Sequence, residues 1–165
     1  MYSRKQVIKE DYDKTADVYD SRYGEIQEEK YRIMLEDLQL KEPILDLGCG
    51  TGLLQKFLKT KLFGVDISFA SLKKSDELSV QGDAEQLPYK DNTFSTVLSF
   101  TTLQNLESAD KMLVEIARVL KQHGIAVVTV LAKFADKLKN AEKYFQILEI
   151  KSCGEDIGLV LASNK

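Results

Sequence analysis

Cysteine, proline and tryptophan are scarce in this chain of 165 residues, which has two Cys, two Pro and no Trp. Cys49 and Cys153 fall in different predicted elements, and neither belongs to a Cys-x-x-Cys pair or a Cys/His cluster. We therefore expect neither a disulfide nor a metal site. With nine glycines, 44% apolar residues and 30% charged residues, the composition excludes a disordered or fibrous chain.

Long apolar runs are also missing. No stretch approaches the roughly 20 apolar residues that cross a bilayer, and the polar start MYSRKQVIKEDYD lacks the apolar segment of a signal peptide. The expected location is therefore cytoplasmic. The net charge of −3 gives no general attraction to nucleic acid. The acidic excess lies in residues 1–42, which contain 8 Lys/Arg and 11 Asp/Glu.

A regular alternation of strand-like and helix-like segments begins after residue 42. Short runs of branched apolar residues predict buried strands at 44–47, 62–65, 96–100 and 125–131. The clearest helical spacing covers 108–121, where Ser108 can cap the helix and Gly124 follows its end. The alternation predicts an α/β fold, a parallel sheet with helices on both faces.

The first 42 residues contain an amphipathic helix but no strand. Tyr31, Met34, Leu35 and Leu38 have helical spacing, so we expect residues 1–42 to pack on the sheet as a helical appendage. The polar segment before this helix contains three tyrosines, which either pack it onto the core or contact a ligand: Tyr12, Tyr19 and Tyr23.

The chain closes with two strand-like runs, 144–153 and 157–162, joined by the turn-forming Gly154. They predict a hairpin that adds an antiparallel strand to the sheet. Between residue 131 and this hairpin there is room for one helix and for no inserted cap. Residues 43–165 then form the sheet core of a single domain spanning 1–165.

The most informative stretch is ILDLGCGTGLLQKFL, a buried strand that runs into a glycine-rich turn and a helix. Gly48, Gly50 and Gly52 let the backbone turn sharply and approach a ligand closely. Their spacing is GxGxG, whereas a dinucleotide site needs GxGxxG and a phosphate-binding loop ends in GK[ST]. Asp46, just before the turn, would repel a diphosphate and favours a cationic ligand.

Two further acids follow the next two strands. Asp66 ends the second strand, 18 residues after Gly48, where a carboxylate can accept hydrogen bonds from both ribose hydroxyls. Asp83 follows a short third strand and can accept from the exocyclic amine of an adenine, with the Ala84 backbone beside the ring. The carboxyl ends of parallel strands meet at one edge, so the three acids predict a single ligand site there.

Four motifs in order, LDLGCGTG, VDIS, GDAEQLPYKDNTFSTVLS and LKQHGIAVVTV, resemble those of class I S-adenosylmethionine-dependent methyltransferases, most closely the ubiquinone/menaquinone-biosynthesis (methyltransferase type 11) group. The resemblance covers roughly residues 12–131 and implies a Rossmann-like, doubly wound sheet of seven strands, the last antiparallel. It also implies S-adenosylmethionine as cofactor and S-adenosylhomocysteine as product.

The same resemblance implies the role of each part of the site. The glycine loop would hold the methionine moiety, Asp66 the ribose, and Asp83 with Ala84 the adenine. An N-terminal YDxxAxxYD segment often folds over the cofactor in this family, and Tyr12, Ala16 and Tyr19 match it. The expected cofactor-binding residues are Tyr12, Tyr19, Asp46, Gly48, Cys49, Gly50, Gly52, Asp66, Ile67, Asp83, Ala84 and Ser99.

The methyl acceptor leaves few signals in the sequence, because transfer from a sulfonium needs positioning more than acid or base catalysis. No catalytic residue is identified, and His123 falls in the predicted turn before 125–131, away from the ligand edge. Polar residues after the fourth strand either line an acceptor pocket or satisfy the loop backbone: Ser99, Thr101, Thr102, Gln104 and Asn105.

Because no cap is inserted, we expect a comparatively open site that takes a macromolecular acceptor, RNA or protein, or is completed by an activating partner protein. One alternative is a small-molecule methyltransferase, which would have a closed cavity near Asp46 and Ser99. Another is a non-catalytic protein that binds S-adenosylmethionine. A nicotinamide dehydrogenase is a weaker alternative because of the glycine spacing.

Overall fold

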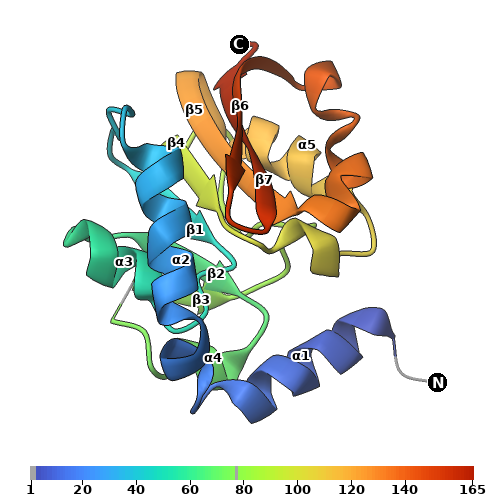
Figure 1. Ribbon diagram of the computed structural model, residues 1–165. Coiled ribbons are helices and arrows are strands. Elements are labelled where there is room, and N and C mark those ends of the chain that lie inside the picture. The colour runs from blue at the N-terminus through green and yellow to red at the C-terminus, as the bar shows by residue number, and fades with distance from the viewer. Residues whose placement is uncertain (1–2, 77) are drawn as a thin grey trace.

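The computed structural model describes residues 3–76 and 78–165 and shows one seven-stranded sheet (Figure 1). The strand order is β3-β2-β1-β4-β5-β7-β6, and β7 runs antiparallel to both of its neighbours. The expected fold class, including the C-terminal antiparallel hairpin, is therefore confirmed. The strands are β1 Ile44–Leu47, β2 Phe63–Asp66, β3 Leu78–Gln81, β4 Phe94–Ser99, β5 Leu120–Leu131, β6 Phe145–Cys153 and β7 Asp156–Ser163.

Helices cover both faces of this sheet (Figure 1). Helices α2 and α3 pack on one face, α5 packs on the other, and α1 lies beyond the carboxyl ends of the parallel strands next to α4. The helices are α1 Arg4–Thr15, α2 Tyr19–Leu35, α3 Leu53–Leu58, α4 Phe69–Leu72 and α5 Ala109–Val119, with 3-10 helices η1 Leu103–Asn105, η2 Ala132–Leu138 and η3 Ala141–Lys143.

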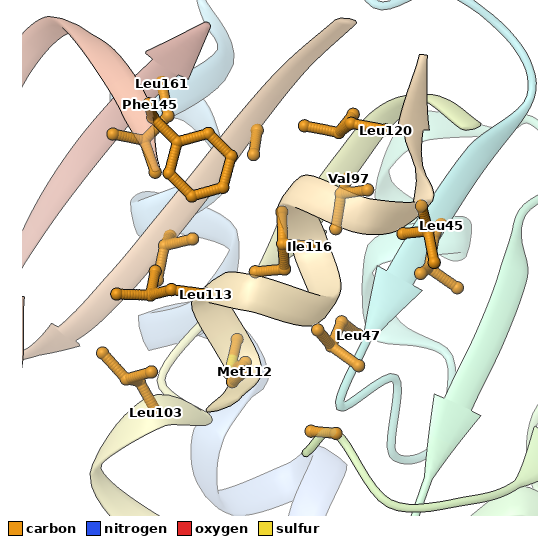
Figure 2. Close-up of a cluster of buried hydrophobic side chains, with 14 of the residues drawn as sticks. Leu45, Leu47, Val97, Leu103, Met112, Leu113, Ile116, Leu120, Phe145 and Leu161 are labelled. Atoms are coloured by element: carbon orange, nitrogen blue, oxygen red, sulfur yellow. The ribbon is translucent and has the colours of Figure 1, made fainter. Parts of the chain in front are cut away.

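The larger part of the core lies under α5 (Figure 2). Met112, Leu113 and Ile116 are fully buried on one face of this helix, and they pack against apolar side chains of the sheet that include Leu47 and Val97. Full burial of such a side chain contributes about 1.5–3 kcal/mol. This face fixes the sheet whose carboxyl edge forms the site.

The second part of the core attaches α2 to the other face of the sheet. Tyr31, Met34 and Leu35 are buried there, as the helical spacing predicted. The Tyr31 ring meets the Phe100 ring edge-on, with centroids 4.7 Å apart. Since Phe100 follows β4, this contact places α2 beside the loops that line the site.

Helix α5 begins as predicted but ends earlier. The Ser108 hydroxyl accepts a hydrogen bond from the Lys111 amide at 3.3 Å and caps the helix. The helix ends at Val119 rather than at residue 121, because Leu120 already pairs with Phe94 as the first residue of β5. Gly124 thus lies inside an irregular stretch of β5 and does not end the helix.

Three further expectations are corrected. Residues 3–42 form two helices, and α2 ends at Leu35, before Leu38. His123 belongs to β5 rather than to a turn, although its φ of 59° is unusual for a strand. Between β5 and β6 the chain forms the 3-10 helices η2 and η3 in place of one regular helix.

None of the helices in the described part of the chain combines the length and the apolar character needed to span a membrane. The cytoplasmic location stays a prediction.

Candidate functional site

A cavity lies at the carboxyl edge of the parallel strands. The empty space within its walls, open solvent included, is about 1010 Å³. Its walls come from the glycine turn after β1, the ends of β2 and β3, the segment after β4, and helices α1 and α2. Of the expected cofactor-binding residues, the following line it: Tyr12, Tyr19, Asp46, Gly48, Cys49, Gly50, Asp66, Ile67, Asp83 and Ala84.

The glycine turn is held in a backbone conformation that favours glycine. Gly48 has φ 84° and Gly50 has φ 52°, in the left-handed region. The amides of Gly48 and Cys49 both donate to the Val65 carbonyl, at 2.8 and 3.1 Å, so the turn is fixed to β2. A Cβ atom on Gly48 would overlap the side chain of Thr102, which explains the need for glycine at that point.

Asp66, the last residue of β2, is oriented by backbone amides. Its carboxylate accepts from Gly50 N at 2.9 Å and from Ser68 N at 2.8 Å. Burial raises the pKa of Asp66 despite these hydrogen bonds. The carboxylate therefore faces the cavity in a poorly solvated setting, where hydroxyl donors from a ligand would stabilise its charge.

Asp83 lies at the other end of the cavity and is paired with α1. Lys5 Nζ donates to Asp83 Oδ2 at 2.6 Å and to Glu85 Oε2 at 2.8 Å. Although burial alone would lower it, hydrogen bonds and charge interactions with the two acids raise the pKa of Lys5 to about 12. Lys5, which the sequence analysis did not identify, thus joins α1 to Asp83.

Asp46 and Cys49 are both buried residues of the cavity wall. Asp46, in β1, is only 4% exposed, and Cys49, within the turn, is only 6% exposed. Neither cysteine forms a disulfide, and both are buried. Residues 3–76 and 78–165 contain no group of three or more His, Cys, Asp or Glu side chains arranged to hold a metal ion.

Two Tyr-Asp pairs, seven residues apart, attach the N-terminal helices to the site. Tyr12 and Tyr19 face the cavity, and their rings are 6.2 Å apart. The acid after each tyrosine binds the scaffold. Asp13 accepts from Ser68 Oγ at 2.6 Å, next to α4, and Asp20 accepts from the hydroxyl of Thr51 within the glycine turn.

The structure leaves Gly52 and Ser99 out of the cavity wall. Gly52 precedes α3 with φ 80° and donates its amide to the Cys49 carbonyl, so its role here is to shape the turn. Ser99 is fully buried, and its hydroxyl donates to the Leu47 carbonyl at 3.0 Å. Ser99 is thus a link between β4 and β1, since a hydroxyl inside a sheet binds the nearest carbonyl.

Of the polar residues after β4, three line the cavity and one does not. Thr101, Thr102 and Asn105 line the cavity, and Asn105 Nδ2 donates to the Tyr12 hydroxyl at 2.8 Å. Gln104 does not line it, and its side chain instead donates to the Thr101 carbonyl.

A buried ion pair that the sequence reasoning missed supports this segment. Lys30 Nζ, on α2, lies 2.9 Å from Asp156 Oδ1 and 2.9 Å from Thr101 Oγ1. Thr101 and Thr129 both donate hydroxyl hydrogen bonds to Asp156, at 2.7 and 2.9 Å. The sequence signal was a lysine on the apolar face of α2, one turn before Met34, where a solvated charge is not expected.

A glycine turn and three carboxylates around one cavity at this edge of a doubly wound sheet define a nucleoside-binding α/β protein. The methyltransferase domain family model matches residues 45–128, from β1 to β5. The chain therefore belongs to the S-adenosylmethionine-dependent methyltransferases, the family that its motifs resemble, and its cofactor is S-adenosylmethionine.

The chain is also similar in sequence to individual curated proteins. The chain is 37% identical over 139 residues to an uncharacterized protein of Methanocaldococcus jannaschii, an alignment that covers 78% of this chain and 53% of that protein. It is 32% identical over 144 residues to demethylmenaquinone methyltransferase of Symbiobacterium thermophilum, covering 73% of this chain and 57% of that enzyme. The chain thus spans about half the length of these curated relatives.

The fold is also that of a solved structure. A chain from the complex between the Haloferax volcanii Trm112 methyltransferase activator and its methyltransferase superposes with a TM-score of 0.79. The match covers 93% of this chain and 98% of that one at 17% identity, so it establishes a shared fold.

Proposed function

We propose that this chain transfers the methyl group of S-adenosylmethionine to an acceptor bound beside the glycine turn. The observation on which this depends is that Asp46, Asp66 and Asp83 line one cavity together with the bare backbone of Gly48 and Gly50. Carboxylates around an apolar turn favour a cationic nucleoside and disfavour a diphosphate. The bound cofactor supplies a methyl group on a positively charged sulfur, so the protein chiefly has to position the acceptor.

In this proposal each wall of the cavity binds one part of the cofactor. The turn holds the methionine moiety, Asp66 accepts from the ribose hydroxyls, and Asp83 with the buried Ala84 binds the adenine. Residues 1–42 form the segment of this single domain that covers the cofactor. Within that segment, Tyr12 and Tyr19 contact the ligand. The contacts that support this are those of the two Tyr-Asp pairs with the scaffold.

Replacement of Asp66 tests the proposal. We expect Asp66→Ala to weaken S-adenosylmethionine binding by about 1.5–3 kcal/mol, because charge-assisted hydrogen bonds are lost. Calorimetry would show this as a rise in Kd of roughly 10- to 150-fold. The exposed Asp91 precedes β4 at the opposite edge of the sheet and pairs with Arg118 of α5, so Asp91→Ala is the matched control.

The same titration has a pH signature. Since the pKa of Asp66 is raised, the carboxylate takes up a proton at a higher pH than an ordinary aspartate, and binding should weaken as the pH falls through that range. Asp66→Ala should lack this dependence. If NAD bound and S-adenosylmethionine did not, or if Asp66→Ala kept full affinity, the proposal would be wrong.

Lys5 gives a kinetic prediction. Helix α1 has no buried residue and is joined to Asp83 and Glu85 through Lys5, so Lys5→Ala should speed S-adenosylhomocysteine dissociation several-fold. Stopped-flow measurements should also show that added NaCl speeds dissociation from the wild type more than from the variant, because salt screens this ion pair. Equal salt dependence in both proteins would contradict this role of Lys5.

The acceptor was expected to be macromolecular, but the cavity supports the small-molecule alternative. Helix α1 lies over the carboxyl edge and lines the cavity together with residues of α2, so the site is less open than the missing cap suggested. A partner protein remains part of the proposal. One support is a group of exposed apolar side chains at the β2–β3 edge of the sheet: Phe63, Leu78 and Val80. The other is the Haloferax volcanii structure of the same fold, which was solved as a complex with an activator protein. Pull-down from native extract, followed by activity assays with labelled cofactor, tests for such a partner.

A further inference from the structure

A second cavity adjoins the first on the side of α2. Its empty space, open solvent included, is about 1070 Å³, and its walls are mainly the end of α1 and the first two thirds of α2, with the end of β5 and the β6–β7 turn. Four residues line both cavities and form the wall between them: Tyr12, Tyr19, Gln27 and Thr101. A molecule in the second cavity would lie next to the ligand of the first.

Aromatic rings form one side of this second cavity. Tyr19 lies between Tyr12 and Tyr23, with ring centroids 6.2 and 5.0 Å away. Val18 and Ile26, both about half exposed, extend the apolar surface. Such a surface favours a flat, apolar ring, because aromatic rings associate in offset or tilted pairs at these distances.

Gln27 provides the polar group of the shared wall. Its side chain is hydrogen-bonded to Tyr19, it is only 6% exposed, and its Oε1 atom is buried with no hydrogen-bond partner among the described residues. A buried carbonyl oxygen without a partner is rare in proteins and unfavourable. A ligand group that donates a hydrogen bond would satisfy it.

The charges around the second cavity do not favour phosphate. Arg22 and Lys30 line it, but Asp11 and Glu155 line it too, and Lys30 is already paired with Asp156. Arg22 also lies over the Tyr23 ring, 5.7 Å from its centroid. The absence of a net positive charge here argues against a nucleic-acid acceptor.

We propose that the second cavity, with Gln27 Oε1 and the Tyr12–Tyr19–Tyr23 row, binds the methyl acceptor, a small aromatic molecule with an N–H or O–H group. This inference rests on the proposed function. The acceptor ring packs on the tyrosines, and its N–H or O–H donates to Gln27, which orients the nitrogen or oxygen lone pair toward the neighbouring cavity.

The reaction at this position is balanced without an added reagent. A bond forms between the acceptor nitrogen or oxygen and the methyl carbon, while the methyl–sulfur bond breaks and leaves its electron pair on sulfur. The proton of the acceptor passes to water, since an amide oxygen is too weak a base to keep it. Gln27 is thus a substrate-contacting residue that orients and does not remove a proton.

Ligand-observed NMR on the full chain saturated with S-adenosylhomocysteine tests the inference. The probes are tyramine and phenol, which carry donors, and toluene, which carries none. We expect saturation transfer to tyramine, phenol or both in the wild type, at least fivefold weaker in Gln27→Met. Toluene should show no such difference. The matched control is Gln104→Met, because Gln104 is also buried with an unpartnered Oε1 but lines neither cavity.

The outcomes separate this inference from the proposed function. Calorimetry with S-adenosylhomocysteine and thermal melting are measured first on every variant. If the wild type does not bind that compound, the proposed function fails. If it binds but no donor-bearing probe does, or if the wild type and Gln27→Met bind the probes equally, the second-cavity inference is wrong. Loss of S-adenosylhomocysteine affinity in a folded Gln27→Met would also overturn it, since Oε1 would then serve the first cavity.

Discussion

Gly48→Ala is expected to destabilise the protein by about 2–5 kcal/mol, the sum of roughly 1–2 kcal/mol for a left-handed alanine and about 1–3 kcal/mol for crowding. Gly48 has φ 84°, and a Cβ atom there would overlap the Thr102 side chain. The turn would have to move away from Val65, to which its amides are bonded. Urea unfolding would report the loss of stability, and calorimetry should show S-adenosylmethionine binding abolished.

A second glycine separates backbone strain from crowding. Gly154, in the β6–β7 turn, has φ 63°, and a Cβ atom there would meet no atom within 4 Å. Gly154→Ala should therefore lose only about 1–2 kcal/mol of stability and keep its affinity for the cofactor. An equal loss in the two variants would mean that contact with Thr102 is not what requires glycine at position 48.

Lys30→Met should lower the free energy of unfolding by about 3–5 kcal/mol, because it leaves the buried Asp156 carboxylate without its cation. The side chain of Lys30 is 4% exposed and that of Asp156 is fully buried. Urea unfolding should detect the change. The Thr101 loop would also lose a contact, so cofactor affinity is expected to fall as well.

Two variants distinguish a buried charge from simple loss of contacts. Lys30→Met with Asp156→Asn removes the unpaired charge and should recover part of the lost stability. Lys56→Met breaks an exposed pair with Asp20 and should cost about 0–1 kcal/mol. If Lys30→Met were as mild as Lys56→Met, the ion pair would not hold α2 to the sheet.

The local sequence was sufficient to predict an element where its apolar pattern and its flanking turn or cap residues indicate the same boundaries. The strand Ile44–Leu47 was predicted to the residue, because a fully buried run in which only Asp46 is polar lies between Pro43 and Gly48. The α5 cap at Ser108 follows from side-chain chemistry alone. The three acids line one cavity because the order of parallel strands brings their carboxyl ends together.

The features that were missed depend on partners distant in sequence. The end of α5 could not be predicted, because Leu120 continues the helical spacing and only its pairing with Phe94 assigns it to β5. Helix α1 has no apolar stripe, and its contacts are with residues such as Ser68 and Asp83. The placement of Ser99 depends on which neighbouring carbonyl its hydroxyl meets.

The attachment of α1 has a consequence for turnover. This helix buries no residue of its own, and apart from the Tyr12–Tyr19 ring contact it is joined to the rest of the chain mainly by polar contacts, so its detachment would leave the hydrophobic core covered. The residence time of a bound nucleoside and the melting temperature are then set by different residues. Substitutions on α1 would thus change the rate of product release while leaving the stability of the sheet unchanged.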